Sequence, residues 1–394
     1  MKIVIMFVRL RKFKMILLYF IGIVSFLCMI FSVFHGFRII RPNIPGRGRS
    51  RTSYPNVTMV KILFFNPPSW FSGFDFSNCV YKDCIISTNK TANINNSDAV
   101  IFNHASLPAY PPLKKQGQKW IFTCSESAHY GVKTCTTPQW RYKFDWTMSY
   151  RRDSDFFFGY GDIVPKKEVT RKNYEKIYEE KKKLVAWIVS HCFTQSKREE
   201  YVEEMSKITK VDVFGSCGSF KCETFKGNEN DTCHDLVARD YKFILAFENS
   251  LCRDYTSEKF YYAYAYDKPI IPVVLGSFTL ENYSHGAVYI DANKFRTPLH
   301  LTRRLVALGN NREYYIDLLR KKDRFTSLTS NQTFTNAMCK MCEGLTLGRP
   351  GRLDLDIAEW FFDEQLCQSS DKTGITFKTG TINRKMAQKY LNKG

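Results

Sequence analysis

The longest uncharged segment of the chain is an apolar run at residues 15–34. At about 1.5 Å of rise per residue, a helix of this length spans the roughly 30 Å hydrocarbon core of a bilayer. The run is longer than the apolar core of a cleaved signal peptide, and no small-residue cleavage site follows it. The pattern predicts a single transmembrane anchor, preceded by a cytosolic tail at 1–14. Residues 35–58 are rich in Arg, Pro, Gly and Ser without periodicity, which predicts a flexible stem.

Downstream of the stem, short apolar runs without polar alternation predict strands that are covered on both faces, as in parallel sheets. In the first half, residues 59–165, these runs lie at 61–65, 99–102 and 119–122. A polar, strongly charged helical stretch at 166–183 follows, and we expect it to link this half to the next.

The second half, residues 184–335, alternates strand and helix patterns, which predicts a second doubly wound sheet. Its strand-like runs lie at 184–189, 211–214, 243–247 and 270–275, and its helical patterns lie at 197–208 and 256–266. The expected fold class is α/β, with two facing domains and a ligand cleft beyond the carboxyl ends of their strands. A closing segment at 336–367 and a polar tail at 368–394 complete the chain.

Composition adds a preference for anionic partners. The 394 residues carry 58 Lys and Arg against 38 Asp and Glu, a formal charge of +20. This surplus favours phosphorylated small molecules, membrane headgroups or nucleic acid. Acidic and basic residues are interleaved, however, as at 179–183, which is more typical of a solvated helix face than of a nucleic-acid-binding arm. We therefore expect no nucleic-acid partner.

Cysteines and glycosylation sequons indicate an oxidising compartment. All but one of the 13 cysteines lie outside the apolar run, and this even number allows full pairing. Cys339 and Cys342 have the spacing of half a zinc site, but no second such pair lies at zinc-ribbon distance, so disulfides are favoured. The cysteines favour a lumenal location for most of the chain. Six glycosylation sequons downstream of the anchor favour it as well, at Asn56, Asn89, Asn95, Asn230, Asn282 and Asn331.

The segment 247–260 carries the strongest candidate chemistry, because it starts at the carboxyl end of a predicted strand and runs into a predicted helix. Tyr255, Glu258 and Lys259 have i, i+3, i+4 spacing, so we expect their side chains on one helix face. The N-terminus of a helix favours an anion. There, Lys259 could neutralise a diphosphate while Glu258 accepts hydrogen bonds from sugar hydroxyls. The alternative is an ordinary amphipathic helix with both charges solvated.

The same segment resembles the donor signature of α1,3-fucosyltransferases, glycosyltransferase family 10. Further similar segments follow in order, so that the resemblance covers roughly residues 60–362: they are 144–155, 183–190, 212–215, 272–276, 339–342 and 357–361. The resemblance implies two facing Rossmann-like domains of the GT-B type, with acceptor binding by the first half and donor binding by the second. It also implies a single-pass type II Golgi membrane protein with a lumenal catalytic part.

The implied reaction is inverting transfer of L-fucose from GDP-β-L-fucose to a GlcNAc hydroxyl, in α1,3 linkage, on glycans of glycoproteins or glycolipids. Glu126 matches the family's proposed general base, although Ala128 stands where the family usually has proline. No cofactor is implied as a requirement, and stimulation by Mn²⁺ or Mg²⁺ stays open. The residues that match the family's donor contacts are Arg198, Asn249, Tyr255, Glu258 and Lys259.

Two rival interpretations remain. Asp153-Ser154-Asp155 is a DxD motif, as in metal-dependent glycosyltransferases, although the preceding Arg151 and Arg152 favour a structural ion cluster. The other rival is a glycan-binding Golgi protein without catalysis, which a missing Glu126, Glu258 or Lys259 would indicate; all three are present. The sequence does not distinguish among an N-glycan core, an antenna GlcNAc and a glycolipid as the acceptor.

Overall fold

The computed structural model describes residues 59–89, 94–131, 133–220, 232–363 and 366–369. The predicted cytosolic tail, anchor and stem lie outside these ranges. So do the sequon residues Asn56 and Asn230 and all but the first two residues of the predicted polar tail. No helix within the described ranges is long and apolar enough to cross a membrane.

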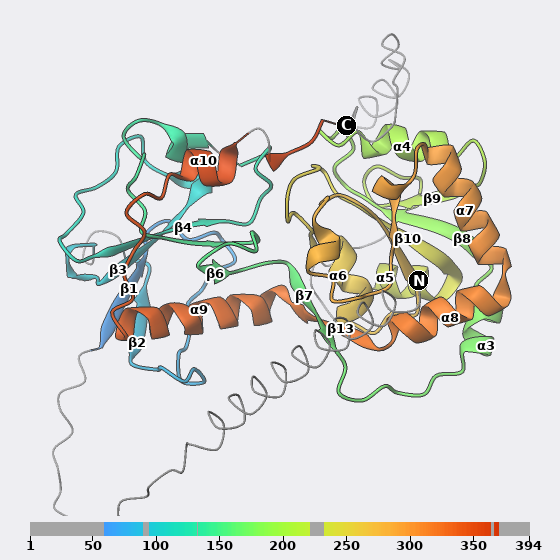
Figure 1. Cartoon of the computed structure of the whole chain (residues 1–394), viewed down its shortest axis with the longest axis horizontal. Helices are drawn as coiled ribbons and strands as arrows, with labels where there is room; N and C mark the ends of the chain where they lie inside the picture. Colours follow the sequence, from blue (N-terminus) through green and yellow to red (C-terminus); the bar gives the residue numbers. More distant parts are fainter. Residues whose placement is uncertain (1–58, 90–93, 132, 221–231, 364–365, 370–394) are drawn as a thin grey trace, which may run out of the picture. The chain divides into compact units, whose positions relative to one another are not determined.

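The first half is built on a six-stranded sheet in which every neighbouring pair of strands is parallel (Figure 1). Along β1, Ile62 and Phe64 pack on one face while Leu63 packs on the other, which explains the continuously apolar run. In sheet order the strands are β2 (Cys84–Ser87), β1 (Val60–Phe64), β3 (Ala99–Asn103), β4 (Lys119–Cys124), β5 (Trp146–Ser149) and β6 (Phe156–Phe157).

The helices that cover this sheet come from the end of the chain. On one face lies α9 (Ser330–Thr346), whose buried Met338 and Met341 pack against the strands (Figure 1). On the other face lies α10 (Ile357–Phe362), together with the segment between β4 and β5. The first half is therefore completed only by residues that follow the second half in the sequence.

Disulfides fix α9 in this position. The two cysteines of the Cys-x-x-Cys motif pair separately with cysteines of the first half, so the predicted disulfide role of this motif is confirmed. Two cysteines are free, buried thiols, so the full pairing that the cysteine count allows is not reached: these are Cys124 and Cys135. The bonds between described cysteines include Cys79–Cys339, Cys84–Cys342, Cys192–Cys217 and Cys252–Cys367.

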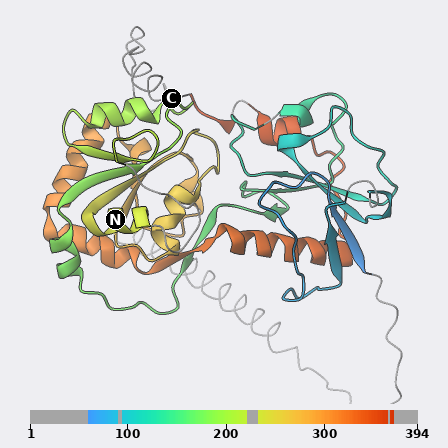
Figure 2. The same cartoon turned by 180° about the vertical axis from the view of Figure 1, so that it is seen from behind.

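The second half contains a five-stranded sheet that is also parallel throughout. Its strands in order are β12 (Ile290–Asp291), β11 (Ile271–Leu275), β10 (Tyr241–Phe247), β8 (Lys183–Ile188) and β9 (Val211–Phe214). Helices cover both faces, as predicted for a doubly wound sheet (Figures 1 and 2). One face carries α4 (Arg198–Met205), α7 (Pro298–Asn310) and α8 (Arg312–Lys322), with α3 (Tyr174–Glu180) beside them; the other carries α5 (Thr232–Asp240) and α6 (Glu258–Ala265).

The two connections between the halves pair with each other. The chain leaves the first half through β7 (Gly161–Pro165) and returns through β13 (Phe325–Thr329), and these strands form an antiparallel ladder (Figure 1). The sequence did not predict this pair, because both strands are short and partly exposed and lie far apart along the chain. The expectation of an α/β fold with parallel sheets is confirmed.

Candidate active site

The candidate site residues follow the carboxyl ends of strands in both halves. Glu126 comes just after β4, Arg198 begins the helix after β8, and Asn249 comes just after β10. This edge of a parallel sheet is where open α/β folds bind their ligands, because loops and helix N-termini gather there.

A hydrogen bond joins the candidate base to the donor signature. The Tyr255 hydroxyl donates to Glu126 Oε1 at 3.0 Å, and the Ser127 backbone N–H donates to the same oxygen at 2.8 Å. The hydroxyls of Ser127 and Ser250, 2.8 Å apart, form a second link between the same two segments. Burial raises the pKa of Tyr255 well above its ordinary value, so this phenol stays protonated and acts as a donor.

Two further tyrosines frame Tyr255. The ring of Tyr150 lies 5.1 Å from that of Tyr255, and the ring of Tyr160 lies 6.3 Å away. The Tyr160 hydroxyl also donates to the Ser125 carbonyl at 2.8 Å, next to Glu126. Tyr160 therefore contacts both the segment that follows β4, through Ser125, and the segment that follows β10, through Tyr255. The sequence analysis missed it because a single tyrosine after a short strand carries no distinctive pattern.

Lys259 lies among oxygen atoms at the start of α6. Its Nζ is 3.1 Å from Glu258 Oε1 and 3.7 Å from Glu248 Oε2, and it donates to Ser257 Oγ at 2.8 Å. Burial alone lowers the pKa of Lys259, but the Glu258 and Glu248 carboxylates outweigh it and the net shift is upward. The ammonium group is therefore held in its charged form beside two acidic groups.

Glu248 is the acidic residue that the sequence analysis overlooked. It is 1% exposed, and its Oε1 accepts the Ser257 backbone N–H at 2.8 Å. Burial raises its pKa. A Cβ atom at Gly276 would lie 2.7 Å from Glu248 Cγ, so any larger residue at this position would displace the Glu248 side chain. The available signal was an acidic residue directly after the buried strand at 243–247, inside the signature itself.

The predicted helix face is wrong for Tyr255. The helix begins at Glu258, and Ser257 before it is extended (φ −95°, ψ −176°), so only Glu258 and Lys259 are helical. Asp254 adopts a left-handed conformation (φ 59°), and its carboxylate accepts the Thr279 hydroxyl at 2.6 Å. This turn directs Tyr255 to Glu126 instead of along the helix.

Arg198 is a buried cation without an ion pair among the described residues. It is 2% exposed, and its guanidinium donates to the carbonyls of Phe247 at 2.5 Å and His191 at 3.0 Å. Its Nε has no hydrogen-bond partner in the described part of the chain, and the same holds for the buried Oδ1 of Asn249. Burial lowers the pKa of Arg198. The carboxylates of Glu248 and Glu199 offset this burial only in part, and a buried charge without a direct ion pair is costly, so this position is suited to an anionic ligand.

The DxD carboxylates are occupied by arginines. Asp153 accepts hydrogen bonds from Arg151 at 2.7 and 3.0 Å, and Asp155 forms ion pairs with Arg349 at 2.9 Å and Arg352 at 3.0 Å. The structural ion cluster predicted for Asp153 is therefore observed. No group of three or more potential metal ligands occurs within the described ranges.

Comparisons with known proteins cover most of the chain. The family described as "Fucosyltransferase, N-terminal" matches residues 58–161, and "Glycosyltransferase family 10 (fucosyltransferase) C-term" matches residues 178–360. These two ranges include every candidate site residue, from Glu126 to Lys259.

Individual relatives agree with these families. The chain is 33% identical over 235 residues to the "Glycoprotein 3-alpha-L-fucosyltransferase A" of Drosophila melanogaster, covering 57% of this chain and 44% of that protein's length. It is 30% identical over 290 residues to a "3-galactosyl-N-acetylglucosaminide 4-alpha-L-fucosyltransferase" of Bos taurus, covering 71% of this chain and 74% of the relative. A crystal structure of an α1,3-fucosyltransferase with GDP-fucose aligns with a TM-score of 0.44 and 15% identity, over 76% of this chain and 94% of that one.

Proposed function

Because the chain belongs to glycosyltransferase family 10, the fucosyltransferases, we propose that it transfers L-fucose from GDP-β-L-fucose to a GlcNAc hydroxyl of a glycan, in α1,3 linkage and with inversion. One observation carries this proposal furthest. The hydrogen bond between Tyr255 and Glu126 brings a carboxylate of the first half to the loop that resembles the donor signature. A base and a sugar-nucleotide site must meet in this way for an inverting transfer.

In this mechanism Glu126 is the general base. The acceptor oxygen attacks the anomeric carbon of fucose, the bond from that carbon to the GDP oxygen breaks, and the hydroxyl proton passes to the Glu126 carboxylate. The two donors on Oε1, from Tyr255 and Ser127, orient the carboxylate and leave Oε2 for the acceptor. Proton transfer of this kind contributes about 10²–10⁴-fold in rate.

The leaving diphosphate would be stabilised by two cations. Arg198 offers a buried positive charge that forms no direct ion pair with a described carboxylate, and Lys259 offers a charged ammonium. When phosphate oxygens replace Glu258 as the partner of Lys259, Glu258 is released to accept a hydrogen bond from a fucose hydroxyl. Positive groups held in place before the reaction stabilise the charge that develops on GDP.

We further propose a GT-B arrangement in a single-pass type II Golgi membrane protein, anchored through residues 15–34 with its catalytic part in the lumen. Disulfides and surface sequons support an oxidising, glycosylating compartment. Asparagines of four sequons are exposed: Asn89, Asn95, Asn282 and Asn331. The test is made on the chain in sealed microsomes. Electrophoretic mobility that changes on glycosidase treatment, together with protection from added protease, would support this topology. An unglycosylated chain that the added protease digests would oppose it.

The test of the function is transfer to defined acceptors. The purified full chain is incubated with GDP-fucose and a panel containing a chitobiose core, an antenna with terminal GlcNAc or galactosyl-GlcNAc, and a glycolipid headgroup. Mass spectrometry then maps the new linkage. We expect an α1,3-linked fucose on at least one member. Glycan binding without turnover on any member would favour the non-catalytic alternative.

A further inference from the structure

The last described residues of the chain pair with the loop that carries the donor signature. Two backbone hydrogen bonds flank one disulfide, and together they form a short antiparallel bridge. These contacts are Arg253 N–H to the Leu366 carbonyl at 2.7 Å, Gln368 N–H to the Leu251 carbonyl at 2.8 Å, and the disulfide Cys252–Cys367 between them. The donor loop is thereby fixed both covalently and through its backbone.

The Gln195 side chain forms hydrogen bonds with both strands of this bridge, and we call this pair of contacts the latch. Its Nε2 donates to the Gln368 carbonyl at 2.9 Å, and its Oε1 accepts the Leu251 N–H at 3.3 Å. Its own backbone N–H donates to the Tyr130 hydroxyl at 3.0 Å. Gln195 lies three residues before Arg198, and Tyr130 lies four residues after Glu126. Gln195 thus connects three loops: the loop that contains Glu126, the loop that precedes Arg198 and the loop that carries the donor signature.

The donor loop lies between β10 and α6, and side-chain contacts such as Tyr255 with Glu126 and Ser250 with Ser127 hold it together with this bridge. Between β10 and α6 the backbone forms no regular element, and Asp254 is held in a left-handed conformation just before Tyr255. A loop that samples many conformations binds its ligand with an affinity reduced by the fraction of time it spends in the competent one. Contacts that hold Tyr255 beside Glu126 therefore raise the affinity for whatever ligand these residues bind.

We propose that residues 366–368, held by the Cys252–Cys367 disulfide and by Gln195, are a positioning clamp that sets the affinity of the donor loop for GDP-fucose. The clamp rests on the proposed function, because it acts on the donor site of that reaction. Residues 366–368 lie beyond the range that the family comparison matches, which ends at residue 360.

The test compares donor binding in two variants of the full chain. Cys252→Ser/Cys367→Ser removes the disulfide without leaving a thiol, and Gln195→Ala removes the latch without touching a cysteine. By calorimetry with GDP, we expect the Kd of the double variant to rise about 10-fold and that of Gln195→Ala a few-fold, since each lowers the competent fraction. The KM for GDP-fucose should rise in parallel, while kcat at saturating donor stays close to wild type.

The matched control is Cys79→Ser/Cys339→Ser, which also removes one disulfide but acts on α9 of the first half. It should lower the melting temperature and leave the Kd for GDP unchanged. Equal loss of GDP affinity in the control, or wild-type Kd values in both clamp variants, would overturn the clamp and leave the proposed function intact. If the disulfide variant does not fold, Gln195→Ala alone decides. If the wild-type chain binds no GDP, the proposed function fails and the clamp fails with it.

Discussion

Glu126 is oriented by two hydrogen-bond donors on a single carboxylate oxygen, from Tyr255 and from the Ser127 backbone. Replacing it by glutamine keeps an oxygen that can accept these bonds but removes the basicity. We expect Glu126→Gln to lower kcat by about 10²–10⁴-fold. Single-turnover kinetics and GDP calorimetry are the measurements, and Kd for GDP should stay unchanged. Glu203→Gln, on the exposed face of α4, is the control; near-normal kcat in Glu126→Gln would place the base elsewhere.

Lys259 holds its ammonium group among the oxygen atoms of Glu258, Glu248 and Ser257. We expect Lys259→Ala to weaken GDP binding by about 10- to 100-fold, because a charge-assisted hydrogen bond to phosphate contributes about 1.5–3 kcal/mol. Calorimetric titration with GDP is the measurement. Lys294→Ala, an exposed lysine of the same half that pairs with Glu281, should leave the affinity unchanged. Unaltered GDP binding in Lys259→Ala would contradict the placement of the diphosphate.

Single residues also show how far the sequence could be interpreted. Side-chain spacing predicted that Glu258 and Lys259 lie at the start of a helix, and the structure confirms this. It misplaced Tyr255, because spacing does not reveal that Asp254 turns the backbone into a left-handed conformation. It overlooked Glu248, whose importance depends on burial and on its contact with Ser257. Local pattern predicts periodicity, whereas turns and tertiary contacts decide where a side chain points.

At the scale of elements, mutation of the segment 151–155 distinguishes the proposed metal-independent mechanism from the metal-dependent alternative. The half-exposed Asp153 pairs with the buried Arg151, which also lies 3.8 Å from Asp254 and so keeps an acidic neighbour when Asp153 is replaced. We expect Asp153→Asn to keep most of the transfer activity, in EDTA as well as in buffer, and to lower the free energy of unfolding only slightly. Loss of turnover in both conditions would support the metal-dependent rival. The readouts are fucose transfer and urea denaturation.

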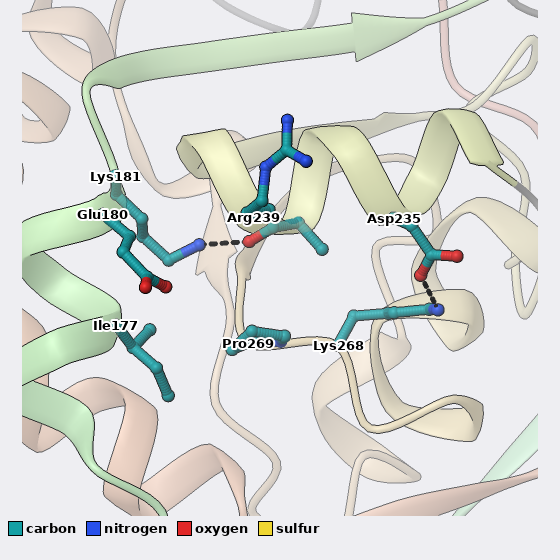
Figure 3. Close-up of a pocket in the computed structure, with 8 residues that line it drawn as sticks. Ile177, Glu180, Lys181, Asp235, Arg239, Lys268 and Pro269 are labelled. Carbon is teal, nitrogen blue, oxygen red and sulfur yellow. Dashed lines mark hydrogen bonds and ion pairs between the residues drawn. The ribbon is translucent and has the colours of Figure 1, made fainter.

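The connection between α3 and β8 holds a buried lysine. Lys181 donates to the Tyr241 carbonyl at 2.8 Å. It also donates to the Ala238 carbonyl near the end of α5 (Figure 3). Beside it is a cavity of about 150 Å³, which Arg239 and Lys268 help to line (Figure 3). Burial lowers the pKa of Lys181 from 10.5 to about 7. The Lys322 ammonium is buried as well, donates to the Lys268 carbonyl at 2.8 Å, and has its pKa lowered to about 7 for the same reason.

These depressed pKa values predict a pH dependence of stability. Between pH 7 and 10.5 the unfolded chain binds protons that the folded chain has released, so the free energy of unfolding rises with pH across this window and is lowest below pH 7. Denaturation at pH 7 and pH 9 measures the slope. Lys181→Met should reduce it, whereas Lys182→Met, at the exposed neighbouring position, should not. A slope unaltered by Lys181→Met would contradict the assigned cause.

The helices and strands differ in how clearly their sequences predict them. The run at 243–247 is apolar throughout because β10 is covered by helices on both faces, and its position was predicted. The ladder of β7 with β13 was not, because Gly161–Pro165 and Phe325–Thr329 each mix buried with half-exposed positions and pair with a strand far away in the sequence. Strands that depend on a distant partner carry a weak local signal.

At the scale of the whole molecule, the halves defined by sequence order differ from the units that pack together. The sequence analysis predicted no helix at the position of α9, and a stripe of apolar residues would not have identified the sheet that this helix covers. The structure shows that the first sheet receives α9 and α10 from the end of the chain. Single mutations in α9 should therefore destabilise the half that binds acceptor in the proposed function.

The attachment of α9 has a consequence for biosynthesis. Cys79 and Cys84 form disulfides with Cys339 and Cys342, which lie 260 and 258 residues further along the chain. At about 5–20 residues per second, translation takes roughly 10–50 s to reach them. During that time these two thiols lack their native partners, and one face of the six-stranded sheet lacks the helix that covers it. The first half to leave the ribosome is thus the last to be completed, because its two disulfides form only after synthesis has passed Cys342.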